Sequence, residues 1–211
     1  VMRGCPLCLR EDAAVSNDAA TTAMVLRGDW QFREMNRCIR HGHPLVPLWS
    51  VKDRRHRFDI RARLNEIEQD ILSGALDRLV TQPSPYDLWL NQRLESGIDE
   101  TWLAAHSVFV VTTFCRLLGH TLLSRGLPHN EITSAAQNAH DLGFMLVVEG
   151  KRRIRQALDE IAKTASKASD EPRKTFQPLY AQLDRDYMNE AGFDPFRDIL
   201  RDCIIAHWPV A

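Results

Sequence analysis

The chain has 211 residues, 44% of them hydrophobic and 26% charged, which predicts a globular protein with a real core and one domain or two small ones. Its formal net charge of -1 excludes a global attraction to nucleic acid, so DNA contact would depend on local clusters of its 27 basic residues. The longest apolar runs, residues 108–111 and 144–148, are far shorter than the about 18 residues that cross a bilayer.

The first residues lead directly into a cysteine pair. Only Val1, Met2, Arg3 and Gly4 precede Cys5, and a metal knuckle with so little before it indicates a chain truncated at its N-terminus. No charged and then apolar leader opens the chain. We therefore expect a cytoplasmic protein without membrane association.

Two close-spaced pairs of metal-ligating residues follow. Cys5 and Cys8 form a Cys-Pro-Leu-Cys knuckle, and Cys38 and His41 form a Cys-Ile-Arg-His knuckle. A structural zinc ion has four soft or borderline ligands in a tetrahedron, and each pair delivers two of them from one turn. We predict one closed, structural Zn²⁺ site with these four ligands and no open position for a substrate. His43 is the alternative fourth ligand, although the two-residue spacing favours His41.

The remaining cysteines and the segment between the knuckles carry less information. Cys115 and Cys203 lie alone in apolar helical surroundings. For the cysteines of the two knuckles, chance occurrence in a loop remains the alternative to a metal site. Residues 12–22 are small and polar, whereas residues 23–37 contain Trp30, which predicts a loop and then short extended segments that pack an aromatic ring on the zinc core. Pro44 and Pro47 should break any regular element before residue 50.

From Asp59 onward the hydrophobic period is that of helices. Asp59 should cap an amphipathic helix over residues 60–79, and Ser84 should cap a second helix that ends at Gly97. Asp99 should cap a third, central helix that reaches residue 124. Further helices are expected over residues 131–146, 151–168, 172–188 and 195–207. The predicted fold class is mainly α, with an N-terminal zinc-finger module (1–50) followed by a multi-helix domain (51–211).

Catalytic motifs are missing from the sequence. It contains no phosphate loop, no zincin helix, no nucleophile elbow and no dinucleotide-binding glycine turn. His106, His120, His140 and His207 fall on separate predicted helices, where a packed or surface histidine is the ordinary interpretation. We predict that the protein is not an enzyme.

Two basic runs are candidates for DNA contact, because clustered Lys and Arg side chains neutralise phosphates in a salt-dependent way. A solvated surface is the alternative for both. The first run contains Lys52, Arg54, Arg55 and Arg57, and the second contains Lys151, Arg152, Arg153 and Arg155.

The cysteine region resembles the finger of the TniQ family of bacterial transposition proteins. Residues 3–12, Trp30 and residues 38–45 match Cys-Pro-x-Cys-Leu-x-Glu-Asp, a tryptophan, and Cys-Pro-x-His-Gly-x-x-Leu, except that Ile39 replaces the second proline. Residues 56–59, 83–85, 143–150 and 196–209 and the helix around Trp102 also resemble family members. The segment before the finger and the helix-turn-helix region expected after residue 209 are missing.

The resemblance implies a non-catalytic target-selection protein of DNA transposition. Such a protein links target DNA, or a guide-RNA complex in some systems, to an AAA+ ATPase that recruits the transposase. The resemblance carries Cys5, Cys8, Cys38 and His41 over as zinc ligands and gives no role to other residues. Two alternatives remain: a protein-protein scaffold without direct DNA contact, and a zinc-containing DNA-binding transcription regulator. The oligomeric state stays open, and a homodimer is compatible with the sequence.

Overall fold

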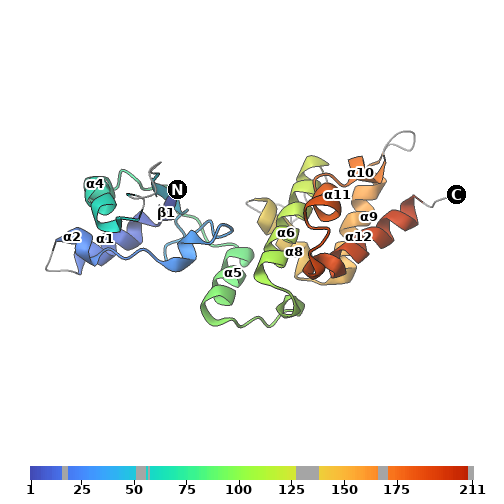
Figure 1. The fold of residues 1–211 in the computed structure, drawn as a ribbon, viewed down its shortest axis with the longest axis horizontal. Coiled ribbons are helices and arrows are strands. Elements are labelled where there is room, and N and C mark those ends of the chain that lie inside the picture. Colours follow the sequence, from blue (N-terminus) through green and yellow to red (C-terminus); the bar gives the residue numbers. More distant parts are fainter. Residues whose placement is uncertain (16–18, 51–55, 57, 127–137, 166–170, 209–211) are drawn as a thin grey trace. The chain divides into compact units, whose positions relative to one another are not determined.

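The structure is a computed structural model that describes residues 1–15, 19–50, 56, 58–126, 138–165 and 171–208 (Figure 1). It is mainly helical and gathers the predicted cysteine–histidine cluster near the N-terminus, which confirms the predicted fold class. The chain divides into two compact units, Val1–Pro83 and Ser84–Ala211. We predicted the boundary at residue 50. It lies later because helix α4 (Ile60–Leu72) packs against α1 (Pro6–Ala14) and α2 (Ala20–Ala23) in the first unit.

The first unit contains a short antiparallel pair of strands. β1 (Met2–Gly4) pairs with β2 (Val46–Trp49), so that Arg3 lies opposite Pro47. We expected the prolines here to break any regular element, and that expectation is wrong. Both strands of a two-stranded sheet are edge strands, which tolerate a proline without an N–H group.

Helix α1 begins immediately after Cys5, where we predicted only a knuckle and a loop. Pro6 occupies the first turn, where its fixed φ suits a helix and its missing N–H has no helical partner to lose. Trp30 is buried, as predicted for an aromatic residue here, but it lies in the 3-10 helix η1 (Gly28–Gln31) instead of an extended segment. Arg3 donates hydrogen bonds to the carbonyls of Trp30 and Phe32, which joins β1 to this segment.

Helix α4 starts where the sequence indicated but ends earlier. The Asp59 side chain accepts a hydrogen bond from the Ala62 N–H at 3.1 Å, which confirms the predicted N-cap. The helix ends at Leu72 instead of residue 79, and Gly74 follows with a φ of 81°. Arg10 of α1 donates to the Ile71 carbonyl at 2.9 Å and so satisfies a backbone group at the C-terminal end of α4.

The second unit begins with the predicted helix α5 (Pro85–Ser96). Ser84 and Asp87 form a reciprocal capping box, and Gly97 ends the helix with a φ of 70°. The predicted single helix from Asp99 is instead a 3-10 helix, η2 (Trp102–Ala105), followed by α6 (Val108–Ser124) with Ser107 as its cap.

Short elements and two longer helices complete the second unit. The start of the helix predicted over residues 131–146 lies outside the described residues, and the helix predicted over residues 172–188 is divided into three short pieces. Pro178 has no N–H to continue an uninterrupted helix there. The elements are α8 (Ala139–Val147), α9 (Lys151–Lys163), α10 (Pro172–Thr175), α11 (Leu179–Ala181), the π-helix η3 (Gln182–Asp186), the 3-10 helix η4 (Ala191–Phe193) and α12 (Asp194–His207).

Helices α6 and α8 form the centre of the second unit. Gly119 of α6 lies against the backbone of Ala139, and Gly143 of α8 lies against the backbone of Cys115. A Cβ atom at Gly119 or Gly143 would stand only 1.8 Å from the opposing carbonyl oxygen, so each helix needs a glycine to reach the other. Although α6 is strongly apolar, no helix in the described part of the chain is long and apolar enough to cross a membrane.

Replacing Gly143 by alanine is expected to lower the free energy of unfolding of the second unit by about 2 kcal/mol or more, because the added methyl group forces the two backbones apart. Urea unfolding followed by circular dichroism measures this loss. Gly28→Ala is the matched control, since a Cβ atom there meets no atom within 4 Å. Equal unfolding midpoints for the two variants would contradict the close helix crossing.

Candidate metal centre

The four predicted ligands meet in the first unit. Cys5, Cys8, Cys38 and His41 place their three Sγ atoms and one ring nitrogen within 4.8 Å of one another. The His41 Nδ1 atom lies 3.2 Å from the Cys8 Sγ atom and 3.7 Å from the Sγ atoms of Cys5 and Cys38. The Sγ atoms of Cys8 and Cys38 are 3.5 Å apart, and all three thiols are buried. This cluster can hold a metal ion.

Local backbone structure presents the ligands in pairs. Cys5 is the N-cap residue of α1, and Cys8 lies in the first turn of the same helix. Cys38 and His41 stand on a tight turn, in which the Gly42 N–H bonds to the Cys38 carbonyl at 2.8 Å. Gly42 has a φ of 60°, a left-handed conformation that glycine adopts without strain. Each knuckle is therefore a helix start or turn that points two ligands the same way.

The structure distinguishes the two histidines that the sequence left as alternatives. His43 is fully buried, and its Nδ1–H group donates to the Pro44 carbonyl at 2.6 Å while its Nε2 atom accepts from the Arg78 N–H at 2.8 Å. Both ring nitrogens of His43 thus have hydrogen-bond partners in the protein, which leaves neither of them for the thiol cluster. His41 is the histidine that faces the thiols, and His43 instead joins the second knuckle to the segment after α4.

Glu11 completes the surroundings of the cluster. The Nε2–H group of His41, on the ring edge away from the thiols, donates to the Glu11 carboxylate at 2.9 Å, and Arg40 pairs with the same carboxylate at 2.8 Å. The hydrogen bond from His41 is the main reason why the pKa of Glu11 is lowered. A carboxylate behind a ligating histidine fixes its tautomer and raises its basicity. Glu11 had no predicted role, although it belongs to the matched motif.

The thiols are electrostatically coupled. Hydrogen bonding with Cys38 is the main cause that raises the pKa of Cys5 to about 11, and it also raises the pKa of Cys8. The hydrogen bonds from Cys5 and Cys8 in turn hold the pKa of Cys38 far below its usual range. A divalent cation bound among the three sulfur atoms would displace thiol protons, because the thiolate is the form that ligates a metal.

Asp12, the second acidic residue of the motif, binds the chain that follows α1. Asp12 pairs with Arg27 at 3.0 Å and accepts a hydrogen bond from the Val25 N–H at 3.1 Å. The Arg27 guanidinium lies 4.9 Å from the centre of a Trp30 ring, a cation–π contact. Through these contacts Asp12 joins the segment that leads to η1 back to α1.

Only the second of the two candidate DNA-binding runs lies among the described residues. Lys52, Arg54, Arg55 and Arg57 lie outside the described residues. The second run opens α9, where Lys151 and Arg152 are exposed. Arg153 lies 3.7 Å from the Glu149 carboxylate and Arg155 lies 3.0 Å from the Asp159 carboxylate, both one helical turn away.

Two residues that we interpreted as isolated are partners in the structure. The Asp159 carboxylate accepts hydrogen bonds from the Cys203 thiol at 3.4 Å and from the His207 ring at 3.0 Å. Burial, followed by the contact with Asp159, raises the pKa of Cys203 to about 12. The carboxylate stands between thiol and imidazole, so the imidazole is not placed to activate the thiol as a nucleophile. His106, in contrast, packs on Trp102 and Phe196 as expected.

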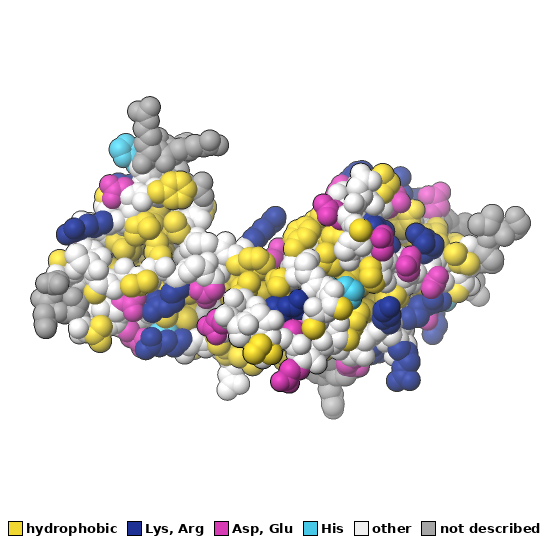
Figure 2. Space-filling model, turned by 60° about the horizontal axis from the view of Figure 1, so that its bottom comes forward, with side chains coloured by type: hydrophobic (Ala, Val, Ile, Leu, Met, Phe, Trp, Pro, Cys, Tyr) yellow, Lys and Arg dark blue, Asp and Glu magenta, His cyan; other side chains and the backbone are white. Residues whose placement is uncertain are grey.

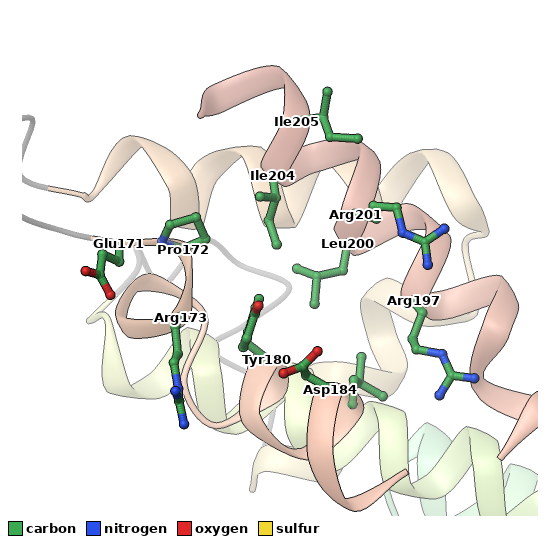
Figure 3. Close-up of a pocket in the computed structure, with 11 residues that line it drawn as sticks. Glu171, Pro172, Arg173, Tyr180, Asp184, Arg197, Leu200, Arg201, Ile204 and Ile205 are labelled. Atoms are coloured by element: carbon green, nitrogen blue, oxygen red, sulfur yellow. The ribbon is translucent and has the colours of Figure 1, made fainter. Parts of the chain in front are cut away.

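A hollow of about 520 Å³ opens between α12 and the segment from α10 to η3 in the second unit (Figure 3). Leu200 and Ile204 of α12 point into it from one side, and Tyr180 and Asp184 line the other. Ile205 is 60% exposed beside it. The lining combines apolar side chains with five charged ones, which are Glu171, Arg173, Asp184, Arg197 and Arg201.

Comparison with known proteins gives no assignment: no protein-family model matches the chain, and neither a curated protein nor a solved structure is significantly similar to it.

His41→Ala is expected to lose tight metal binding, whereas His43→Ala keeps one metal ion per chain and lowers only the stability of the first unit, because it removes a buried hydrogen-bonded ring. Metal content after gel filtration, measured by mass spectrometry, separates the two variants. Loss of the ion from His43→Ala with His41→Ala still loaded would reverse the ligand assignment.

Glu11→Gln should weaken metal binding by about 10-fold or more, because the ligating imidazole loses the carboxylate that orients it and raises its basicity. Competition for Zn²⁺ against a chromophoric chelator measures the change. Asp70→Asn, an exposed carboxylate on α4, controls for loss of one negative charge. Equal zinc affinities in the two variants would show that Glu11 has no part in the site.

Proposed function

We propose that this protein is a non-catalytic accessory factor of DNA transposition, similar to TniQ proteins, with one structural Zn²⁺ and a part in choosing the target site. In this proposal it is a cytoplasmic protein of a bacterial mobile element. It binds target DNA, or in some systems a guide-RNA complex, and recruits an AAA+ ATPase. The observation that carries the proposal is the cysteine–histidine finger together with its acidic partners.

Distances support zinc as the metal. Zn–S bonds of about 2.3 Å and Zn–N bonds of about 2.0–2.1 Å in a tetrahedron separate two sulfurs by about 3.8 Å and a sulfur from a nitrogen by about 3.6 Å. The separations in the cluster are 3.5 Å between the sulfurs of Cys8 and Cys38 and 3.2–3.7 Å between sulfur and nitrogen. Four protein ligands leave no open coordination position, so the proposed ion holds the fold and does no chemistry.

The acidic pair of the finger motif has a physical reason in this fold. Glu11 accepts the hydrogen bond from the ligating His41, and Asp12 fixes the segment that leads to Trp30. The motif positions that are not ligands therefore serve the same metal-centred unit. This supports the resemblance to the TniQ finger beyond the ligand spacing alone.

The start of α9 is the described place best suited to phosphate. Lys151, Arg152 and Arg153 occupy the first turn, which has no acidic residue and no side-chain cap. Cations near a helix N-terminus oppose the helix dipole, each at a cost of about 0.3–1 kcal/mol. A DNA phosphate there would offset this repulsion and accept hydrogen bonds from the basic side chains. On the face seen in Figure 2, basic and acidic side chains are interspersed.

A second candidate function is a scaffold that docks the ATPase without touching DNA. The hollow beside α12 favours the scaffold, because Ile205 is exposed at its edge. Exposed apolar side chains beside a hollow are typical of protein-binding surfaces. In that case the cations of α9 would only be solvated.

Fluorescence anisotropy of the zinc-loaded chain with duplex DNA across a salt series tests the DNA proposal. We expect the affinity for DNA to fall steeply as the salt concentration rises. The slope of the logarithm of the association constant against the logarithm of the salt concentration should become shallower by about 0.9 for each phosphate contact that is removed. The double variant Lys151→Gln with Arg152→Gln should weaken binding. It should also slightly stabilise the free protein, because it relieves repulsion with the helix dipole.

Lys163→Gln is the matched control, since it removes a positive charge from the opposite end of the same helix. A control that weakens binding as much as the double variant would point to general charge instead of the α9 start. No binding at low salt would reject direct DNA contact and favour the scaffold.

A further inference from the structure

A second group of metal-ligating side chains lies where α9 packs against α12. Cys203 and His207 are one turn apart on the same face of α12, and Asp159 faces them from α9. Ligand atoms of these three residues lie within 4.8 Å of one another. The group belongs wholly to the second unit and shares no residue with the cluster in the first.

Its contacts converge on one oxygen atom. Asp159 Oδ1 lies 3.0 Å from the His207 Nε2 atom, 3.4 Å from the Cys203 Sγ atom and 3.0 Å from the Arg155 Nε atom. Two of these three neighbours, the imidazole of His207 and the thiol of Cys203, carry atoms that ligate metals. Three different metal-ligating groups, from Asp159, Cys203 and His207, therefore already converge within 4.8 Å of one another.

We propose that Asp159, Cys203 and His207 form a second metal site, which takes a borderline divalent cation such as zinc and leaves a fourth position open to solvent. The residue types suit this ion, because thiolate, imidazole and carboxylate are its usual protein ligands. Binding releases the Cys203 thiol proton, and the anionic thiolate and carboxylate then balance the two charges of the cation.

The distances fit such an ion. Tetrahedral zinc separates a sulfur from an oxygen ligand by about 3.6 Å and a nitrogen from an oxygen ligand by about 3.4 Å. The corresponding separations are 3.4 Å and 3.0 Å, so movements of a few tenths of an ångström complete the site. The side chains of Asp159 and His207 are about a third exposed, which gives the ion a path from solvent.

Arg155 competes for the site. Its guanidinium already pairs with the carboxylate that the metal would use, so a bound cation must displace it. The side chain is 31% exposed and can turn outward into water. Three ligands and a competing cation make this site weaker than the closed four-ligand cluster, and its ion should exchange with the solution.

Cobalt(II) titration of the full chain tests the proposal after the first cluster has been filled with one equivalent of Zn²⁺. Zinc outranks cobalt at a given site, so cobalt does not enter the first cluster. We expect one further equivalent of Co²⁺ by equilibrium dialysis, with visible absorption of a tetrahedral ion bound to one thiolate. His207→Ala and Asp159→Asn should each weaken it by more than the about 10–100-fold typical of an outer-shell partner.

Arg155→Gln separates a metal site from a hydrogen-bonded group, because only a metal site should bind Co²⁺ more tightly when the competing cation is removed. Asp202→Asn on α12 is the matched control and should leave cobalt binding unchanged. Asp202 and His207 are both exposed, so replacing either one should keep the fold. Absence of a second equivalent in the natural chain overturns the proposal. So does a second equivalent that survives both His207→Ala and Asp159→Asn, or one that Arg155→Gln does not strengthen.

Discussion

The joining of two distant knuckles at one cluster is the constraint on which the first unit depends. Several of its elements are small: β1 has three residues, α2 four and η1 four, whereas α1 and α4 are longer. Elements of this length do not persist alone in water, because the entropy of ordering them exceeds what their few hydrogen bonds return. Cys5 and Cys8 at the start of α1, held against Cys38 and His41, fix the ends of the chain that carries these elements.

The second unit depends on a different interaction. Its centre is the contact of α6 with α8, where Gly119 and Gly143 bring two backbones together and large apolar side chains such as Phe114 and Phe144 fill the space around them. That packing uses no residue of the cysteine cluster. The two halves therefore depend on separate interactions, one on a few polar ligands and one on tight apolar packing.

What the sequence predicts well is local. The ligand pairs follow from spacing, and Asp59 and Ser84 cap helices through bonds that span three residues. What it predicts poorly depends on partners far along the chain. β2 forms because β1 lies beside it, and Asp99 does not start a helix because its carboxylate accepts hydrogen bonds from Trp89 and Thr101 and pairs with Arg93. The i, i+4 spacing of Cys203 and His207 was visible, but Asp159 joins them only through packing.

The electrostatics of α9 links these separate observations. Its first turn carries cations where the helix dipole disfavours them, and its middle carries Asp159, which draws Arg155, His207 and Cys203 to one oxygen. The first arrangement gathers positive charge that Glu149 offsets only in part, whereas the second places an imidazole and a thiol beside a carboxylate that Arg155 already pairs. An anion at the start of the helix would reduce the repulsion among the cations there. A cation at the middle of the helix would take the place of Arg155, so α9 carries one candidate site for each sign of charge.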